Sequence, residues 1–167
     1  MNIFVTSDTF FGRKLAATQG GFSSLEEMED RIIENWNAKI KPNDIVYHLG
    51  NFGWDPISTE SAIIHLNGKI FFVGGEYDKH LSEISLVKIG KHVLLPAISE
   101  IPKINTVFSH WPLSNWANRE EGSIHIHGGL KQEQITNRFC ANIANWNWSP
   151  IEFDFINDIV KQQQVAL

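Results

Sequence analysis

Five short segments of the sequence each place polar or ionisable side chains directly after an apolar run. They are residues 7–10 (Ser-Asp-Thr-Phe), 50–52 (Gly-Asn-Phe), 74–78 (Gly-Gly-Glu-Tyr-Asp), 109–112 (Ser-His-Trp-Pro) and 125–129 (His-Ile-His-Gly-Gly). Two-metal hydrolases place hard carboxylate and imidazole ligands on separate rigid strands, which fixes two cations roughly 3.5–4 Å apart. The segments therefore favour a site of the metal-dependent hydrolase type.

Apolar periodicity predicts the elements that position the first three segments. Strands are predicted over residues 2–6, 45–49 and 69–73, and amphipathic helices over residues 25–40 and 59–66. The β-α-β-α-β order implies a parallel sheet with right-handed crossovers, and ligands gather at the carboxyl ends of the strands in such sheets. We therefore expect the segments to share one edge of a sheet.

The second half of the chain has a different pattern. Short strands are predicted over residues 86–89, 92–95, 106–109, 123–127 and 139–143, and a final helix over residues 152–164. Their close spacing, with Gly and Pro between them, favours a more antiparallel sheet packed against the first. With no linker or internal repeat in view, residues 1–167 are predicted to form one α/β domain.

Bulk composition argues against several classes of protein. The net charge is −5 and the 14 Lys and Arg residues are scattered, so electrostatics gives no reason to expect nucleic-acid binding. The apolar runs are too short to span a bilayer and no signal peptide is evident, so we expect no membrane partner. The single cysteine, Cys140, fits a reducing compartment, and we expect a cytoplasmic protein.

The order and spacing of these segments resembles the small bacterial and phage members of the calcineurin-like metallophosphoesterase family over nearly the whole chain. The family motifs Ser-Asp-Xaa-His-Phe-Gly-His and Val-Tyr-His-Leu-Gly-Asp-Phe are resembled by residues 7–13 and 46–52. Its Gly-Asn-His-Asp, His-Tyr-Pro and His-Gly-His-Xaa-His motifs are resembled by residues 75–78, 110–112 and 127–131. The resemblance implies an α/β fold, a metallophosphoesterase-like β-sandwich of two mixed sheets flanked by helices.

Several positions of the family's two-metal centre carry other residues in this chain. Asp8 and His110 match metal ligands, but Phe10 stands where the resemblance places a histidine. Asn51 stands in place of the aspartate that bridges both metals, and a neutral amide bridges poorly. The resemblance therefore implies a first metal position too weakly liganded to be filled.

Further departures affect the second metal and the catalytic motif. Glu76 occupies the position of an asparagine ligand, and Tyr77 and Asp78 occupy the catalytic motif, with Tyr77 in place of its histidine. Gly129 and Lys131 replace two terminal histidine ligands. The remaining candidate set of Asp8, Asn51, Glu76 and His110 would offer at most one site for Mn²⁺ or Zn²⁺, and we expect no cofactor.

The preferred hypothesis is a pseudoenzyme: a catalytically inactive domain of this fold acting as a scaffold for a protein partner. Candidate partner-binding residues are Trp111, Trp116 and Trp148, because Trp is enriched at binding hot spots. One alternative is residual metal-dependent phosphoesterase activity at a rearranged single-metal site. A second is metal-free binding of a phosphate or nucleotide by Arg13 and Lys131.

Several of these residues also have purely structural interpretations. Asp8 can cap a loop or pair with Lys131, and His110 can be a buried histidine bonded to backbone. His125 and His127 alternate on a predicted strand and share a face, which permits metal binding, but we favour a structural role for both.

Overall fold

Two β-sheets form the centre of the protein, and the computed structural model describes residues 1–84, 86, 90, 92–130 and 135–165. The strands are β1 (Ile3–Thr6), β2 (Ile45–His48), β3 (Lys69–Val73), β4 (Val93–Leu95), β5 (Ile98–Ile101), β6 (Thr106–Ser109), β7 (Ile124–His127), β8 (Arg138–Cys140) and β9 (Ile151–Glu152). The helices are α1 (Lys14–Gln19), α2 (Leu25–Lys39), α3 (Pro56–His65) and α5 (Phe153–Val165), with short 3₁₀ turns η1 (Lys79–Ser82), η2 (Pro102–Ile104) and η3 (Ile143–Trp146).

Both sheets are mixed. The five-stranded sheet has the order β4-β3-β2-β1-β9, in which β1 to β4 run parallel and β9 pairs antiparallel with β1. The four-stranded sheet has the order β5-β6-β7-β8, in which only β5 is antiparallel to its neighbour. An α/β architecture of two mixed sheets flanked by helices, as predicted, is therefore confirmed.

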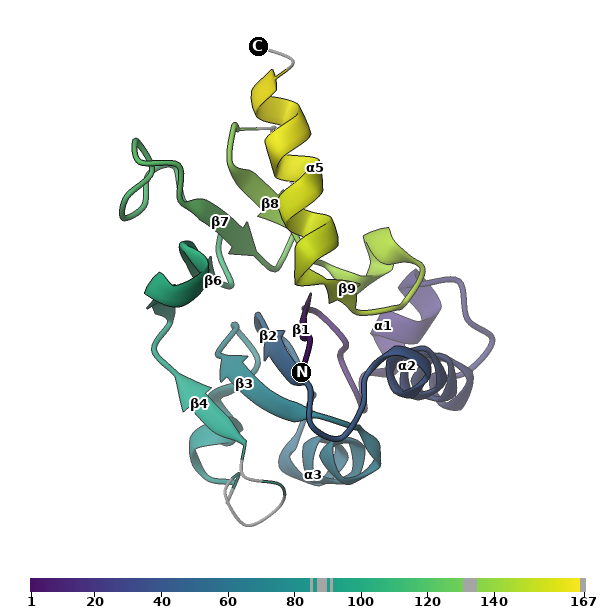
Figure 1. Ribbon diagram of the computed structural model, residues 1–167. Helices are drawn as coiled ribbons and strands as arrows, with labels where there is room; N and C mark the ends of the chain where they lie inside the picture. Colours follow the sequence, from purple (N-terminus) through teal and green to yellow (C-terminus); the bar gives the residue numbers. More distant parts are fainter. Residues whose placement is uncertain (85, 87–89, 91, 131–134, 166–167) are drawn as a thin grey trace.

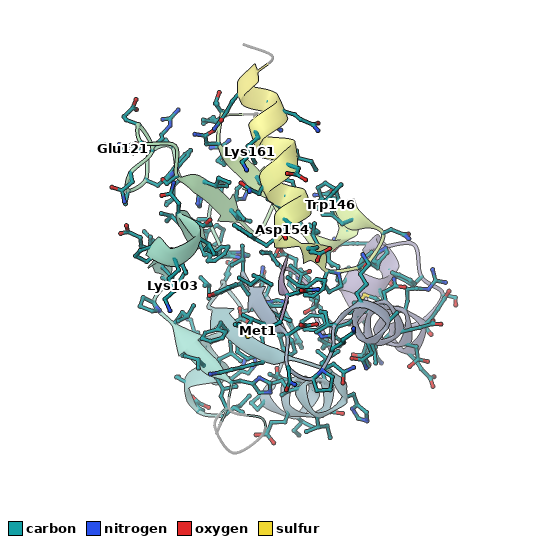
Figure 2. All side chains as sticks on the ribbon, viewed as in Figure 1. Met1, Lys103, Glu121, Trp146, Asp154 and Lys161 are labelled. Carbon is teal, nitrogen blue, oxygen red and sulfur yellow. The ribbon has the colours of Figure 1, made fainter. Side chains whose placement is uncertain are left out.

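Alternating burial divides the five-stranded sheet between two hydrophobic clusters. Phe4 and Val46 face a cluster formed with α1, α2 and α3, whereas Val5 and Tyr47 face the second sheet and α5. The rings of Tyr47 and Phe108 stack with centroids 4.5 Å apart, which joins the two sheets. In Figure 1, α2 and α3 lie on one side of the first sheet and the β6-β7-β8 strands on the other, and Figure 2 shows side chains filling both layers.

The helix boundaries follow local capping chemistry. Ser24 caps α2 by accepting a hydrogen bond from Glu27 N, and the Glu27 carboxylate accepts one from Ser23 N. The predicted helix over residues 59–66 was placed too late, because Asp55 is the N-cap and Pro56 occupies the first turn of α3. Helix α1 was not predicted. No helix in the described ranges is long and apolar enough to cross a membrane.

The second half departs from its predicted sheet. Strands β6, β7 and β8 run parallel, and only β5 pairs antiparallel with β6, so the more antiparallel character predicted for the second sheet is confined to one edge. Strand β4 extends the first sheet beside β3 instead of joining the second. Strands β5 and β9 were missed, and β8 ends at Cys140, before the η3 turn. In the predicted strand over residues 86–89, Leu86 is helical and residues 87–89 lie outside the described part.

Candidate functional site

The loops that follow β1 and β2 run side by side beyond the ends of the strands. Backbone bonds join Asp8 N to Gly50 O at 2.9 Å and Phe10 N to Asn51 O at 3.0 Å. Asp8, Phe10 and Asn51 have φ values of 58°, 49° and 57°, in the left-handed region that side chains usually avoid. Strained backbone of this kind clusters at functional sites, and here it turns the Asp8 and Asn51 side chains towards each other.

A buried network connects three of the sequence-predicted metal ligands. Asn51 Nδ2 lies 3.0 Å from Asp8 Oδ1 and 3.2 Å from His110 Nε2. Asn51 Oδ1 accepts a hydrogen bond from Tyr77 N at 3.2 Å. The structure therefore brings together Asp8, Asn51 and His110, three side chains from three different loops.

His110 enters this network through its backbone contact. Its Nδ1 lies 2.7 Å from Leu49 O and donates to that carbonyl, which leaves Nε2 as the acceptor for the Asn51 amide. Gly50 permits the approach, because a Cβ there would lie 2.4 Å from His110 Nδ1, and its φ is +96°. The bond from a buried His110 to backbone, one of the two roles that the sequence left open for this residue, is present.

Asp8 is held by donors on both carboxylate oxygens. Besides the Asn51 amide on Oδ1, Oδ2 accepts bonds from Ser7 Oγ at 2.6 Å and Gly129 N at 2.7 Å. Burial raises the pKa of Asp8, while these three donors and His110 oppose that rise. Asp8 therefore caps its loop, which is one of the two structural interpretations given for it above. Lys131, its other suggested partner, lies outside the described residues.

The donor chemistry of the network does not fit a divalent metal ion. The group that Asn51 directs at Asp8 and His110 is its NH₂, which donates hydrogen bonds and has no lone pair for a metal. Rotating the amide would aim Oδ1 at the Asp8 carboxylate and remove the bond from Tyr77 N. Within the described ranges, no group of three His, Cys, Asp or Glu side chains is placed to hold a metal.

Glu76, the fourth predicted ligand, does not join the network. Its side chain is exposed, and none of the hydrogen bonds among described residues uses its carboxylate. The neighbouring Tyr77 contacts Asn51 through its backbone N–H. The structure thus places Glu76 at the edge of the site and leaves the predicted set of four ligands incomplete.

Asp78 anchors the loops instead of facing an open site. Its Oδ2 accepts bonds from Asn51 N at 2.5 Å and Gly75 N at 2.7 Å, and its Oδ1 accepts one from Phe52 N at 2.9 Å. With three backbone donors on a buried carboxylate, Asp78 holds the loop after β3 against the loop after β2. The resemblance places Asp78 in the catalytic motif, and this anchoring role was not predicted from the sequence.

Arg13 and Tyr77 belong to an aromatic cluster beside the network. The Arg13 guanidinium lies over the rings of Phe10, Trp54 and Tyr77, at 4.8, 4.8 and 4.9 Å from their centroids. Trp54 and Tyr77 have ring centroids 5.1 Å apart, and Phe10 and Tyr77 6.0 Å. Trp54 was not singled out in the sequence, because only the fold brings these loops together.

The three candidate partner-binding tryptophans occupy different environments. Trp111 is 55% exposed and packs edge-on against the His110 ring, with centroids 4.6 Å apart. Trp116 is buried and donates from Nε1 to Ser123 O, so the structure places it in the interior and not on a binding surface. Trp148 is half-buried and packs against Phe22 with centroids 4.8 Å apart. Only Trp111 borders the network.

Burial lowers the pKa of four histidines in the interior, His48, His92, His125 and His127. The pKa of His48 falls to about 3 and that of His125 to about 4. His125 donates from Nδ1 to Val107 O and accepts from Leu113 N, while His127 donates to Gly128 O. These contacts are structural, as favoured for His125 and His127.

We expect stability to fall as the pH drops from 6.5 towards 4. Unfolded histidines bind a proton near pH 6.5, whereas folded His48 and His125 do so only near 3 and 4, so the unfolded state takes up more protons in this window. Asp8, with its raised pKa, acts in the opposite direction. His125→Gln keeps a side chain that can both donate and accept hydrogen bonds. Its unfolding free energy, measured in urea at several pH values, should change with pH less steeply than that of the wild type, by up to about 1.4 kcal/mol per pH unit. Exposed His65→Gln should leave the slope unchanged, and an unchanged slope in His125→Gln would contradict the assignment.

Comparisons with known proteins identify relatives without an assigned activity. No family model matches the chain. An uncharacterized protein of Methanocaldococcus jannaschii is 23% identical over 98% of this chain and 94% of its own length. A crystal structure of a protein of unknown function from Aquifex aeolicus shares the fold, with a TM-score of 0.68 and 21% identity over 95% of this chain and 98% of that one. A phosphopantetheinyl hydrolase from Mycobacterium tuberculosis overlaps at a TM-score of only 0.37, with 9% identity over 74% of this chain and 52% of that one, too low to bear on the fold.

Proposed function

We propose that this chain is a non-catalytic, metallophosphoesterase-like domain that binds a protein partner at the strand-end loops of its first sheet. The observation that carries the proposal is the Asn51 amide, which donates to both Asp8 and His110. A two-metal hydrolase needs acceptors aimed at two cations at this place. Here the polar groups satisfy one another without a metal.

The surroundings of the network support binding rather than turnover. Trp111 packs against His110, and the cluster of Phe10, Trp54 and Tyr77 adjoins the network through the contact of Tyr77 N with Asn51. Trp54 and Trp111 are both exposed beside this network, whose polar groups bond to one another. Exposed tryptophans are enriched among the residues that dominate protein interfaces. We therefore place the partner over these loops.

Catalytic inactivity is tested with a phosphodiester substrate. Purified protein should hydrolyse bis-p-nitrophenyl phosphate in Mn²⁺ or Zn²⁺ no faster than its His110→Ala variant, because no metal-bound water is available to attack. Metal-dependent hydrolysis that disappears in His110→Ala would overturn the proposal and favour the single-metal phosphoesterase.

A further inference from the structure

The Arg13 guanidinium is held in a box of three aromatic rings contributed by three loops. Its central carbon lies within 4.9 Å of the ring centroids of Phe10, Trp54 and Tyr77. Trp54 and Tyr77 also contact each other, so two of the walls support one another. A guanidinium placed over several rings gains cation–π attraction and loses rotational freedom before any ligand arrives.

The polar edge of this guanidinium has no partner in the part of the chain that the structure describes. None of the hydrogen bonds or ion pairs among those residues involves the Arg13 side chain, although it is only half-buried between the rings. Five N–H donors in a planar fork match the two oxygens of a carboxylate or phosphate. The box therefore presents an orientated cation without an anion.

The surrounding donors favour a carboxylate over a phosphate. Phosphate sites gather several backbone N–H groups around the anion. Here Gly12 N donates to Glu29, Gly75 N to Asp78 and Gly129 N to Asp8, so these three glycine donors are already occupied by the protein's own carboxylates. The Arg13 fork alone can satisfy a carboxylate bidentately.

We propose that Arg13, orientated by Phe10, Trp54 and Tyr77, receives the carboxylate of an acidic side chain in a protein partner. Trp54, which is 45% exposed, offers apolar surface directly beside it. The chain's net charge of −5 opposes polyacidic segments, so a lone Asp or Glu flanked by apolar residues fits best. The inference rests on the proposed function and adds the chemistry that the partner must supply.

The test is selection of random twelve-residue peptides displayed on phage against the intact chain, followed by affinity measurement with the enriched synthetic peptides. We expect enrichment of a single Asp or Glu next to aromatic or aliphatic residues. Arg13→Ala should weaken binding about 30-fold, the scale of an interface hot spot, and Arg13→Lys should fail to restore it because an ammonium lacks the fork. Arg31→Ala, which removes an exposed arginine on α2, is the matched control and should bind normally.

The variants separate this inference from the proposed function. Peptides that depend on Trp111 but bind Arg13→Ala normally would overturn the role of Arg13 and leave the proposed binding face intact. Failure to enrich any peptide, or peptides insensitive to both residues, would count against both. Thermal stabilisation by phosphate or ATP that requires Arg13, with no response to acidic peptides, would overturn the carboxylate assignment. Near-ultraviolet circular dichroism of each variant verifies that the fold is retained.

Discussion

Replacing Asn51 by aspartate is expected to destabilise the protein by about 3 kcal/mol in the absence of metal. The new carboxylate would face Asp8 Oδ1, where the amide now donates at 3.0 Å, and two buried carboxylates at this distance repel each other. For a domain of this size, the loss corresponds to a fall of roughly 6–12 °C in Tm, measured by calorimetry in EDTA at pH 7.5.

Acid and metal should each rescue the Asn51→Asp variant. As the pH falls, one of the two carboxylates takes up a proton because their mutual repulsion raises the pKa of the pair, and the stability difference from the wild type should shrink. Mn²⁺ should raise the Tm of the variant and leave that of the wild type unchanged. The control is Asn147→Asp, since Asn147 has a similar left-handed backbone but is exposed. A variant as stable as the wild type in EDTA would show that the Asn51 amide does not hold the network together.

Replacing Asp78 by asparagine is expected to cost about 3–4 kcal/mol in urea unfolding. The carboxylate accepts backbone bonds from Asn51, Gly75 and Phe52, and hydrogen bonds to charged groups contribute about 1.5–3 kcal/mol each. An amide keeps one acceptor oxygen and turns its NH₂ towards another donor, so at least one backbone N–H stays buried without a partner.

The control for Asp78 is Asp30→Asn, an exposed carboxylate on α2. Its change should remain within about 0.5 kcal/mol, as for surface substitutions in general. If Asp78→Asn were equally mild, the carboxylate would not be anchoring the two loops. Asp78 would then be free for the chemical role that its motif position suggested.

The position of the polar network could be predicted from the sequence because it depends on sheet geometry. Strands predicted at residues 2–6 and 45–49 run parallel, so their following loops must meet, and Asp8 and Asn51 do. The interpretation of Asn51 as a substituted metal ligand came from the resemblance to the metallophosphoesterase family. That its NH₂ group donates one hydrogen bond to Asp8 and one to His110 is visible only in the structure.

The features that the sequence did not predict also have physical explanations. An apolar run predicts a strand but not which other strand it pairs with, so β4 was assigned to the wrong sheet. Strand β9 is two residues long, too short for any period to register. The Arg13 box joins three loops through ring contacts, and no spacing along the chain encodes such contacts. Trp116 was an attractive surface candidate by residue type, but its burial could only be seen in the fold.

The central claim, that hydrogen bonds from Asn51 stand in place of a metal centre, is tested most directly by counting bound metal. Wild-type protein and Asn51→Asp would be incubated with Mn²⁺ and Zn²⁺, desalted and weighed by native mass spectrometry. We expect the wild type to retain far less than one ion per chain, and Asn51→Asp to retain more because it regains a carboxylate ligand. About one ion per wild-type chain, lost in His110→Ala, would contradict the claim and restore a metal-dependent function.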